Sequence, residues 1–224
     1  DRHGTAVVVL ASVLRACSIC EIDLNRVTIG QIGLGAAGMG VVETLQNYVG
    51  NPILGADIVE ERLQRLESWG GIPSTMEEVM AKADIVVATT GVKNLIPPEM
   101  VRPGQVIFAL SNPESEILPA VALERGAALA ADGRSVNNLL GFPGIWRGAL
   151  DCRASSITQG MLIDAATALA DIASPNDILP FVLDKGVHRV VAQAVAQAAM
   201  RTGVARKPLD EDYFERPRDT VLGA

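Results

Sequence analysis

The feature that most constrains the fold is a run of β-forming residues, 27–32, that leads directly into a glycine-rich turn. The turn has the spacing G-x-G-x-x-G and is formed by Gly33, Gly35 and Gly38, and a helical pattern follows it over residues 39–48. A strand that enters a helix through such a turn aims backbone N–H groups at a phosphate. Gly33 permits the tight turn, Gly35 lets a pyrophosphate approach the backbone, and Gly38 lets the helix pack closely on the strand. The segment therefore predicts a dinucleotide-binding turn.

An aspartate supplies the second half of this pattern. Residues 52–57 read as the next strand and end in Asp57, which follows Gly38 by 19 residues. At this spacing a carboxylate accepts hydrogen bonds from both hydroxyls of a ribose. The alternative is a solvated aspartate that merely ends a strand. We expect Asp57 to bind the ribose of the dinucleotide.

Further cofactor contacts are expected within the turn and at the end of a later strand. Ala36 and Ala37 lie between the second and third glycines of the turn. Thr89, Thr90 and Gly91 come at the end of an apolar, strand-like run. In a parallel sheet such a strand end lies at the carboxyl edge, where a dinucleotide crosses the switch point. We expect these five residues to line the cofactor.

The residues that follow Asp57 favour NAD over NADP. Glu60 and Glu61 would bring negative charge to the 2′-phosphate of NADP, and Arg62 is the only cation close to them in the sequence. An NAD site uses the acidic residue for the ribose, whereas an NADP site places an arginine at the extra phosphate. NAD is therefore the expected cofactor and NADP the alternative.

Strand-like and helical patterns alternate over the first part of the chain. The core must be built from Val, Ile, Leu and Ala, because 49% of the residues are hydrophobic and only 4% are aromatic, and this is typical of parallel sheets covered by helices. The alternation predicts an α/β fold with a doubly wound, Rossmann-type parallel sheet flanked by helices. The strand-like runs are residues 27–32, 53–57, 85–89, 106–110 and 127–131, and the helical patterns are residues 37–48, 61–69, 75–83 (capped by Ser74 or Thr75) and 119–125.

Three helical patterns lie outside this alternating region and have no strands between them. Residues 5–16 are apolar nearly all round, which predicts a buried helix. Residues 155–173 and 186–202 are long, alanine-rich helical patterns. We expect one domain over residues 1–206, with the C-terminal helices of residues 155–206 packed on it. An irregular arm, residues 207–224, should follow.

The net charge limits the classes of binding partner, and the cysteines indicate the redox setting of the chain. The net charge of −7 argues against nucleic acid and anionic membranes. Cys17 and Cys20 form a C-x-x-C without a second pair or a nearby histidine, so we interpret them as structural thiols. There is no uninterrupted apolar stretch of about 18 residues and no signal peptide pattern at the first residues. A reduced, cytoplasmic setting is expected.

Four segments together resemble the malic enzymes, which are NAD(P)- and metal-dependent oxidative decarboxylases of L-malate. The resemblance runs from Asp1 to about Arg206. The four segments are residues 1–6 (DRHGTA), the glycine turn with Asp57, residues 108–113 (FALSNP) and residues 133–151 (GRSVNNLLGFPGIWRGALD).

The resemblance implies roles for three side chains. Asp1 matches an aspartate that ligates Mg²⁺ or Mn²⁺, hard cations that prefer carboxylate oxygen. Asn112 and Asn138 match asparagines that contact the substrate or the nicotinamide. Other roles stay open, because Asn112 could cap the loop before Pro113 and Asn137 could be a turn residue. The implied substrate and product are L-malate and pyruvate, and a homo-oligomer, a dimer, is expected.

The resemblance also identifies parts of the enzyme that this sequence lacks. In the family, the general-acid tyrosine, the general-base lysine and a Glu-Asp pair of metal ligands lie upstream of the segment that begins here. Tyr48, Tyr213 and Lys93 do not match them. We expect the cofactor-binding domain of an NAD-dependent malic enzyme, inactive without the upstream catalytic domain. The alternatives are a domain of another hydroxy-acid or amino-acid dehydrogenase, and a non-catalytic NAD-binding or subunit-interaction module.

Overall fold

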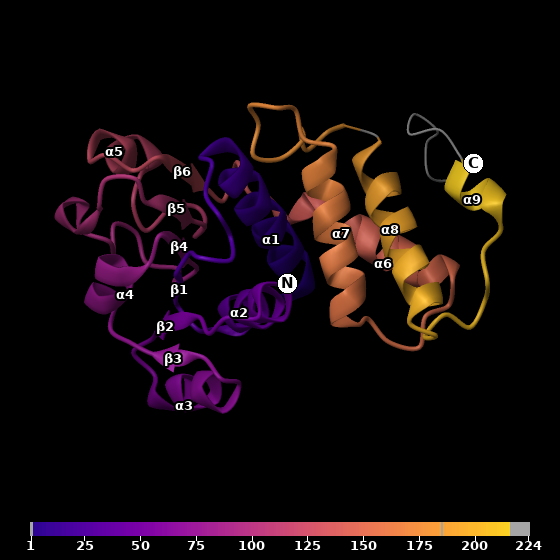
Figure 1. The fold of residues 1–224 in the computed structure, drawn as a ribbon, viewed down its shortest axis with the longest axis horizontal. Coiled ribbons are helices and arrows are strands. Elements are labelled where there is room, and N and C mark those ends of the chain that lie inside the picture. The colour runs from indigo at the N-terminus through magenta and orange to yellow at the C-terminus, as the bar shows by residue number, and fades with distance from the viewer. Residues whose placement is uncertain (1, 185, 216–224) are drawn as a thin grey trace. The chain divides into compact units, whose positions relative to one another are not determined.

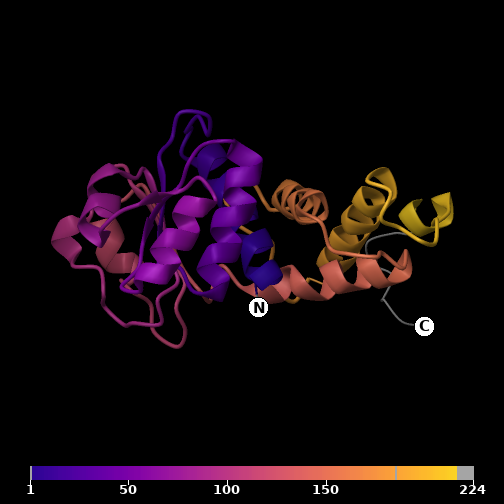
Figure 2. The same ribbon diagram turned by 90° about the horizontal axis from the view of Figure 1, so that it is seen from below.

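The computed structural model describes residues 2–184 and 186–215. The chain divides into two compact units, shown in Figure 1 and, after a quarter turn, in Figure 2. The sheet unit comprises Arg2 and Ala16–Val136. The helical unit comprises His3–Arg15 and the described residues that follow Val136.

The sheet unit is built on six parallel strands in the order β3-β2-β1-β4-β5-β6. In this order the chain starts in the middle, winds outward to β3, and returns to wind the other way, so the switch point lies between β1 and β4. The predicted doubly wound, Rossmann-type parallel sheet is confirmed. The strands are β1 (Ile29–Ile32), β2 (Leu54–Ala56), β3 (Ile72–Pro73), β4 (Ile85–Ala88), β5 (Val106–Ala109) and β6 (Leu129–Asp132).

Helices flank this sheet and complete its core. Strand β4 shows how apolar the centre is, because all four of its residues are 0% exposed. Such continuous burial is the pattern of a central parallel strand covered on both faces. The helices of the sheet unit are α2 (Ala36–Val49), α3 (Glu60–Ser68), α4 (Met76–Lys82), α5 (Pro119–Glu124) and the 3₁₀ turn η1 (Pro98–Met100).

A capping box fixes the start of α4. The Thr75 hydroxyl accepts a hydrogen bond of 3.2 Å from the Glu78 amide, and the Glu78 carboxylate accepts one of 3.0 Å from the Thr75 amide. The cap is therefore Thr75 and not Ser74, whose hydroxyl donates to the Ile72 carbonyl at 3.2 Å.

The cap predicts unequal effects of two neighbouring substitutions. Thr75→Ala should lower the free energy of unfolding by about 1 kcal/mol, because it leaves a helix N–H group without its partner. Ser74→Ala, the matched control, should leave it nearly unchanged. Urea unfolding of both variants measures the difference, and equal losses would contradict this assignment of the cap.

The helical unit contains no strand within its described residues. Helix α8 packs against both α6 and α7, and Figure 1 shows α7 and α8 next to each other with α6 behind them. The Arg15 guanidinium holds the connection before α8 by donating to the carbonyls of Ser174, Pro175 and Asp177 at 2.8, 2.7 and 3.1 Å. The elements are residues 3–15 of α1 (Arg2–Ile19), η2 (Asn138–Leu140), α6 (Phe142–Asp151), α7 (Gln159–Asp171), α8 (Val187–Arg201) and α9 (Glu211–Glu215).

Helix α1 is the buried helix that residues 5–16 predicted. Ala6, Val7, Val8, Val9, Leu10 and Ala11 are at most 1% exposed. By length and composition alone α1 could also cross a membrane, with a mean hydropathy of 1.2 over 18 residues, but 61% of that window is buried inside the protein. Such burial is typical of a core helix.

Four elements differ from the sequence-based expectation. Strand β3 was not predicted, because two residues carry no periodicity. Helix α6 was not predicted either, because Phe142-Pro143-Gly144 reads as a turn, although proline is tolerated in a first helical turn. Helix α7 starts at Gln159 and not at Ser155, because Thr158 caps it. The tail, predicted to be irregular, contains α9, and residues 216–224 lie outside the described residues.

Candidate cofactor site

The glycine turn connects β1 to α2 as predicted. Gly33 has a φ of +88°, and its amide donates to the Ala56 carbonyl at 2.8 Å. A Cβ on Gly38 would lie 1.9 Å from the Gly33 carbonyl oxygen, so only glycine lets α2 approach the turn this closely. A Cβ on Gly35 would meet no atom of the described residues within 4 Å. The turn is thus crowded at its first and third glycines and open at its second.

The open side of the turn is the start of α2. Gly35 is the N-cap residue, Ala36 and Ala37 begin the helix, and no side chain of the described residues caps it. The first N–H groups of such a helix lack intrahelical partners and carry a partial positive charge. The turn therefore offers donors to a phosphate on its open side.

A buried glutamine that sequence reasoning missed supports the turn from behind. Gln31 is 1% exposed, and its Nε2 donates to the Ile32 carbonyl, the Gly33 carbonyl and the Thr89 hydroxyl at 3.1, 3.0 and 2.8 Å. Thr89 in turn donates to the Gly33 carbonyl at 3.3 Å. Gln31 therefore ties the turn to the end of β4. A polar residue inside an apolar strand, directly before the glycines, was the available signal.

Asp57 lies just beyond β2 and is bound to the turn. Its side chain is 4% exposed, and its Oδ2 accepts a hydrogen bond of 2.7 Å from the Leu34 amide. Its Oδ1 accepts one of 2.9 Å from the Val59 amide, and the Arg62 guanidinium lies 3.1 Å from Oδ2. Burial raises the pKa of Asp57, but the hydrogen bonds from these amides and from Arg62 outweigh it and hold the pKa below its ordinary value. The carboxylate is ionised and fixed beside the glycine turn.

The lowered pKa of Asp57 predicts an acid sensitivity. A carboxyl group whose pKa is lower in the folded state stabilises the fold above its unfolded pKa, and this stabilisation is lost as pH falls through the folded pKa. The ordinary value is 3.8, so the loss is expected below that pH. In urea unfolding from neutral to acidic pH, the difference in stability between the unaltered chain and Asp57→Asn should shrink below pH 3.8. A difference that stays constant with pH would contradict this account.

The ends of β4 and β5 form the second part of the site. The Gly91 amide donates to the Ser111 hydroxyl at 2.7 Å, which joins the loop after β4 to the loop after β5. Asn112 follows Ser111 and is exposed. Its carboxamide lies beside Gly133, where an added Cβ would be 2.6 Å from its Nδ2, and it lines a cavity at these strand ends.

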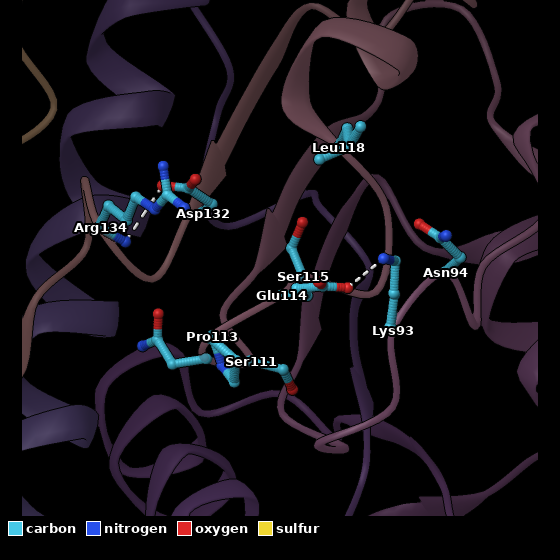
Figure 3. A pocket seen from close by; sticks show the side chains of 10 residues that line it. Lys93, Asn94, Ser111, Pro113, Glu114, Ser115, Leu118, Asp132 and Arg134 are labelled. Atoms are coloured by element: carbon cyan, nitrogen blue, oxygen red, sulfur yellow. Dashed lines mark hydrogen bonds and ion pairs between the residues drawn. The ribbon is translucent and has the colours of Figure 1, made fainter.

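A cavity of about 480 Å³, lined by Asn112 among other residues, lies at the ends of β4, β5 and β6. Figure 3 shows Lys93 paired with Glu114 across it, and Asp132 beside Arg134, whose backbone amide donates to the aspartate at 3.1 Å. The lining residues are Lys93, Asn94, Ser111, Asn112, Pro113, Glu114, Ser115, Leu118, Asp132 and Arg134.

Two predicted site residues lie outside the described residues of the sheet unit. Asn138 begins η2 in the helical unit, where Asn137 caps the turn by accepting a hydrogen bond of 3.0 Å from the Leu139 amide. Asn137 is thus a turn residue. Asp1 lies outside the described residues. Among the residues that are described, no group of three or more His, Cys, Asp or Glu side chains could hold a metal ion.

The cysteines play no part in the site. Burial raises the pKa of Cys17 to about 11, and it also raises the pKa of Cys20 and of Cys152. A thiol with a raised pKa is a poor nucleophile and a poor metal ligand. This agrees with the interpretation of Cys17 and Cys20 as structural thiols.

The sequence of this chain is similar to those of several known proteins. A family model described as malic enzyme, NAD binding domain, matches residues 60–202. NAD-dependent malic enzyme 1 of Bacillus subtilis is 52% identical over 201 residues, which cover 89% of this chain and 46% of that protein. The bifunctional malic/malolactic enzyme of the same organism is 34% identical, with 100% of this chain and 61% of that protein covered. The chain thus spans about half the length of these curated relatives.

Solved structures agree with the sequence relatives. The crystal structure of malic enzyme from Pyrococcus horikoshii superposes with a TM-score of 0.85 at 34% identity, covering 95% of this chain and 57% of that chain. The NAD-dependent malic enzyme from Thermotoga maritima gives a TM-score of 0.79 at 34% identity, covering 88% and 58%. An NADP-dependent malic enzyme of Rhizobium meliloti is also similar, at 35% identity over 94% of this chain and 33% of that protein.

Proposed function

This chain belongs to the malic enzyme family and matches the NAD-binding domain of these enzymes. We therefore propose that the sheet unit holds NAD along the carboxyl ends of its strands. The observation that carries the proposal is the glycine turn, crowded at Gly33 and Gly38 and open at Gly35. The pyrophosphate fits this open side and the first N–H groups of α2. Asp57 would accept hydrogen bonds from the adenosine ribose.

The second half of the sheet would receive the nicotinamide. A doubly wound sheet binds one mononucleotide with each half, so the loops after β4 and β5 face the second one. Thr89 positions the end of β4 through Gln31 and Gly33, and the adjoining Thr90 and Gly91 would line the ring. When bound, NAD supplies the hydride acceptor. Asn112 would donate or accept a hydrogen bond at the ring or at the substrate.

The preference for NAD rests on charge around the adenosine ribose. Asp57 is ionised, and Glu60 and Glu61 lie in the first turn of α3. A 2′-phosphate would meet these charges, whereas Arg62, the nearby cation, is already paired with Asp57. We therefore propose NAD as the cofactor and NADP as the weaker ligand.

The proposed reaction of the whole protein is the oxidative decarboxylation of L-malate to pyruvate and CO₂. Asn112 and Asn138 would contact the substrate or the nicotinamide. Asp1 would contribute to a Mg²⁺ or Mn²⁺ site, but the described residues do not supply a metal-binding set, so we assign no step to the metal. Assembly as a homodimer stays a prediction.

Turnover assays test whether this chain binds the cofactor while catalysis requires an upstream half. With L-malate, NAD⁺ and Mg²⁺ or Mn²⁺, the 224-residue chain should form no NADH, because it contains no match to the acid and base of the family. A protein that joins it to an upstream half like that of its relatives should form NADH and pyruvate in equal amounts. Robust turnover by this chain alone would contradict the proposed division, and no turnover by the joined protein would contradict the proposed reaction.

A further inference from the structure

A buried carboxylate lies between the loops that carry the proposed nicotinamide contacts. Glu116 follows β5 and is 0% exposed. Among the described residues that are buried and charged, the other is Arg189, which lies on α8 in the helical unit. A buried carboxylate is costly unless hydrogen bonds or an opposite charge compensate for its lost hydration. For Glu116 the two loops that it joins provide hydrogen bonds.

Four donors from these loops surround Glu116. Its Oε1 accepts hydrogen bonds from the Thr90 amide and the Thr90 hydroxyl at 2.7 and 2.9 Å, and a short one from the Ser111 hydroxyl. Its Oε2 accepts one from the Ser111 amide at 3.2 Å. Thr90 follows β4 and Ser111 follows β5, so one carboxylate joins the ends of two neighbouring strands.

The direction of the hydroxyl protons is fixed by neighbouring amides. The Gly91 amide donates to the Ser111 hydroxyl at 2.7 Å, and the Val92 amide donates to the Thr90 hydroxyl at 3.1 Å. Each hydroxyl oxygen thus accepts from the backbone, and its own proton is directed at Glu116. Thr90 and Ser111 are therefore the donors in all four hydrogen bonds, and the Glu116 carboxylate is the acceptor, which is the only role that a carboxylate can take.

The backbone around Glu116 is held as well. The Ile96 amide donates to the Glu116 carbonyl at 3.0 Å, and the Asn94 amide donates to the Ser115 carbonyl at 3.1 Å. These bonds join the segment after β5 to the segment after β4 on a second side. Thr90, Gly91 and Asn112 are thus carried by one hydrogen-bonded frame with Glu116 at its centre.

We propose that Glu116 is a positioning residue for the nicotinamide half of the cofactor. It holds the loop of Thr90 and Gly91 and the loop of Ser111 and Asn112 in one fixed arrangement, and it acts through them without touching the ring. This inference rests on the proposed function, because it takes the ends of β4 and β5 as the nicotinamide side. It goes further by assigning the geometry of that side to one buried carboxylate.

The test compares ligands that occupy both halves of the sheet with a ligand that occupies only one. Glu116→Gln keeps the shape of the side chain but places an NH₂ group among four donors. It should raise the dissociation constant of NAD⁺ about tenfold, equivalent to about 1.4 kcal/mol. The dissociation constant of AMP, which needs only the glycine turn and Asp57, should stay unchanged. Isothermal titration of the full chain with NAD⁺ and with AMP measures both.

Two further variants keep the test decisive. Glu124→Gln, on the exposed face of α5, is the matched control and should leave both dissociation constants unchanged. Ser111→Ala removes one of the four donors and replaces Glu116→Gln if that variant does not fold. A selective loss of NAD⁺ affinity supports the proposal. Equal losses for NAD⁺ and AMP, or no loss, would overturn it, whereas an unaltered chain that binds neither ligand would contradict the proposed function itself.

Discussion

Replacing Gly38 with alanine is expected to abolish NAD binding and to lower the free energy of unfolding by about 1–3 kcal/mol or more. The new methyl group would lie 1.9 Å from the Gly33 carbonyl oxygen. That oxygen belongs to the backbone of a turn at φ +88°, held by a 2.8 Å hydrogen bond from its amide to the Ala56 carbonyl. The clash can be relieved only by opening the turn or displacing α2. Urea unfolding and titration with NADH measure the two losses.

Gly35→Ala is the matched variant, because it adds the same methyl group to the same turn. Its Cβ would meet no described atom within 4 Å. The cost in stability should therefore be below about 1 kcal/mol, which is the loss expected for alanine at an N-cap. The methyl group would nevertheless stand where the pyrophosphate approaches, so NADH binding should weaken at least about tenfold. A Gly35→Ala variant that binds normally, or a Gly38→Ala variant as stable as the unaltered chain, would contradict this account of the turn.

Asp57→Asn is expected to weaken NAD binding by about tenfold to a hundredfold and to shift the preference toward NADP. Hydrogen bonds to a charged group contribute about 1.5–3 kcal/mol, and the asparagine lacks that charge. The substitution also releases Arg62, whose guanidinium now lies 3.1 Å from the carboxylate. A free arginine at this position can pair with a 2′-phosphate. The ratio of the dissociation constants for NADH and NADPH measures the shift.

Asparagine is a sharper probe here than alanine. The two oxygens of Asp57 accept hydrogen bonds from the Leu34 and Val59 amides, so asparagine leaves one of these N–H groups without its acceptor, whereas alanine leaves both and perturbs the fold more. The double variant Asp57→Asn, Arg62→Ala should lose the gain in NADPH affinity. If the ratio of the dissociation constants for NADH and NADPH is unchanged in Asp57→Asn, the proposal that Asp57 and Arg62 set the preference between the two cofactors is wrong.

The fold and the glycine turn could be predicted because their signals are local. The glycine turn and the strand that ends at Asp57 lie within about thirty residues, the length of one βαβ unit. Strand β3 escaped prediction because its two residues form a strand only by pairing with β2. Helix α6 escaped because its Phe-Pro-Gly start reads as a turn.

The supporting residues could not be predicted because their partners are distant in the sequence. Glu116 meets Thr90, which lies 26 residues away, and Gln31 meets Thr89 at a separation of 58. An acid before Ile117 carries no motif, and a glutamine inside an apolar strand marks an unusual position without identifying its partner. Their roles follow only from the parallel order of β1, β4 and β5, which brings the three strand ends together.

The most direct test of the central claim is a titration of the chain with NADH, followed by nicotinamide fluorescence and repeated with the Gly35→Ala variant. The account predicts saturable binding at one site that AMP displaces and that the substitution weakens, while the variant keeps its cooperative unfolding transition. If NADH at millimolar concentration does not bind to the folded chain, the assignment of the glycine turn as the cofactor site is wrong.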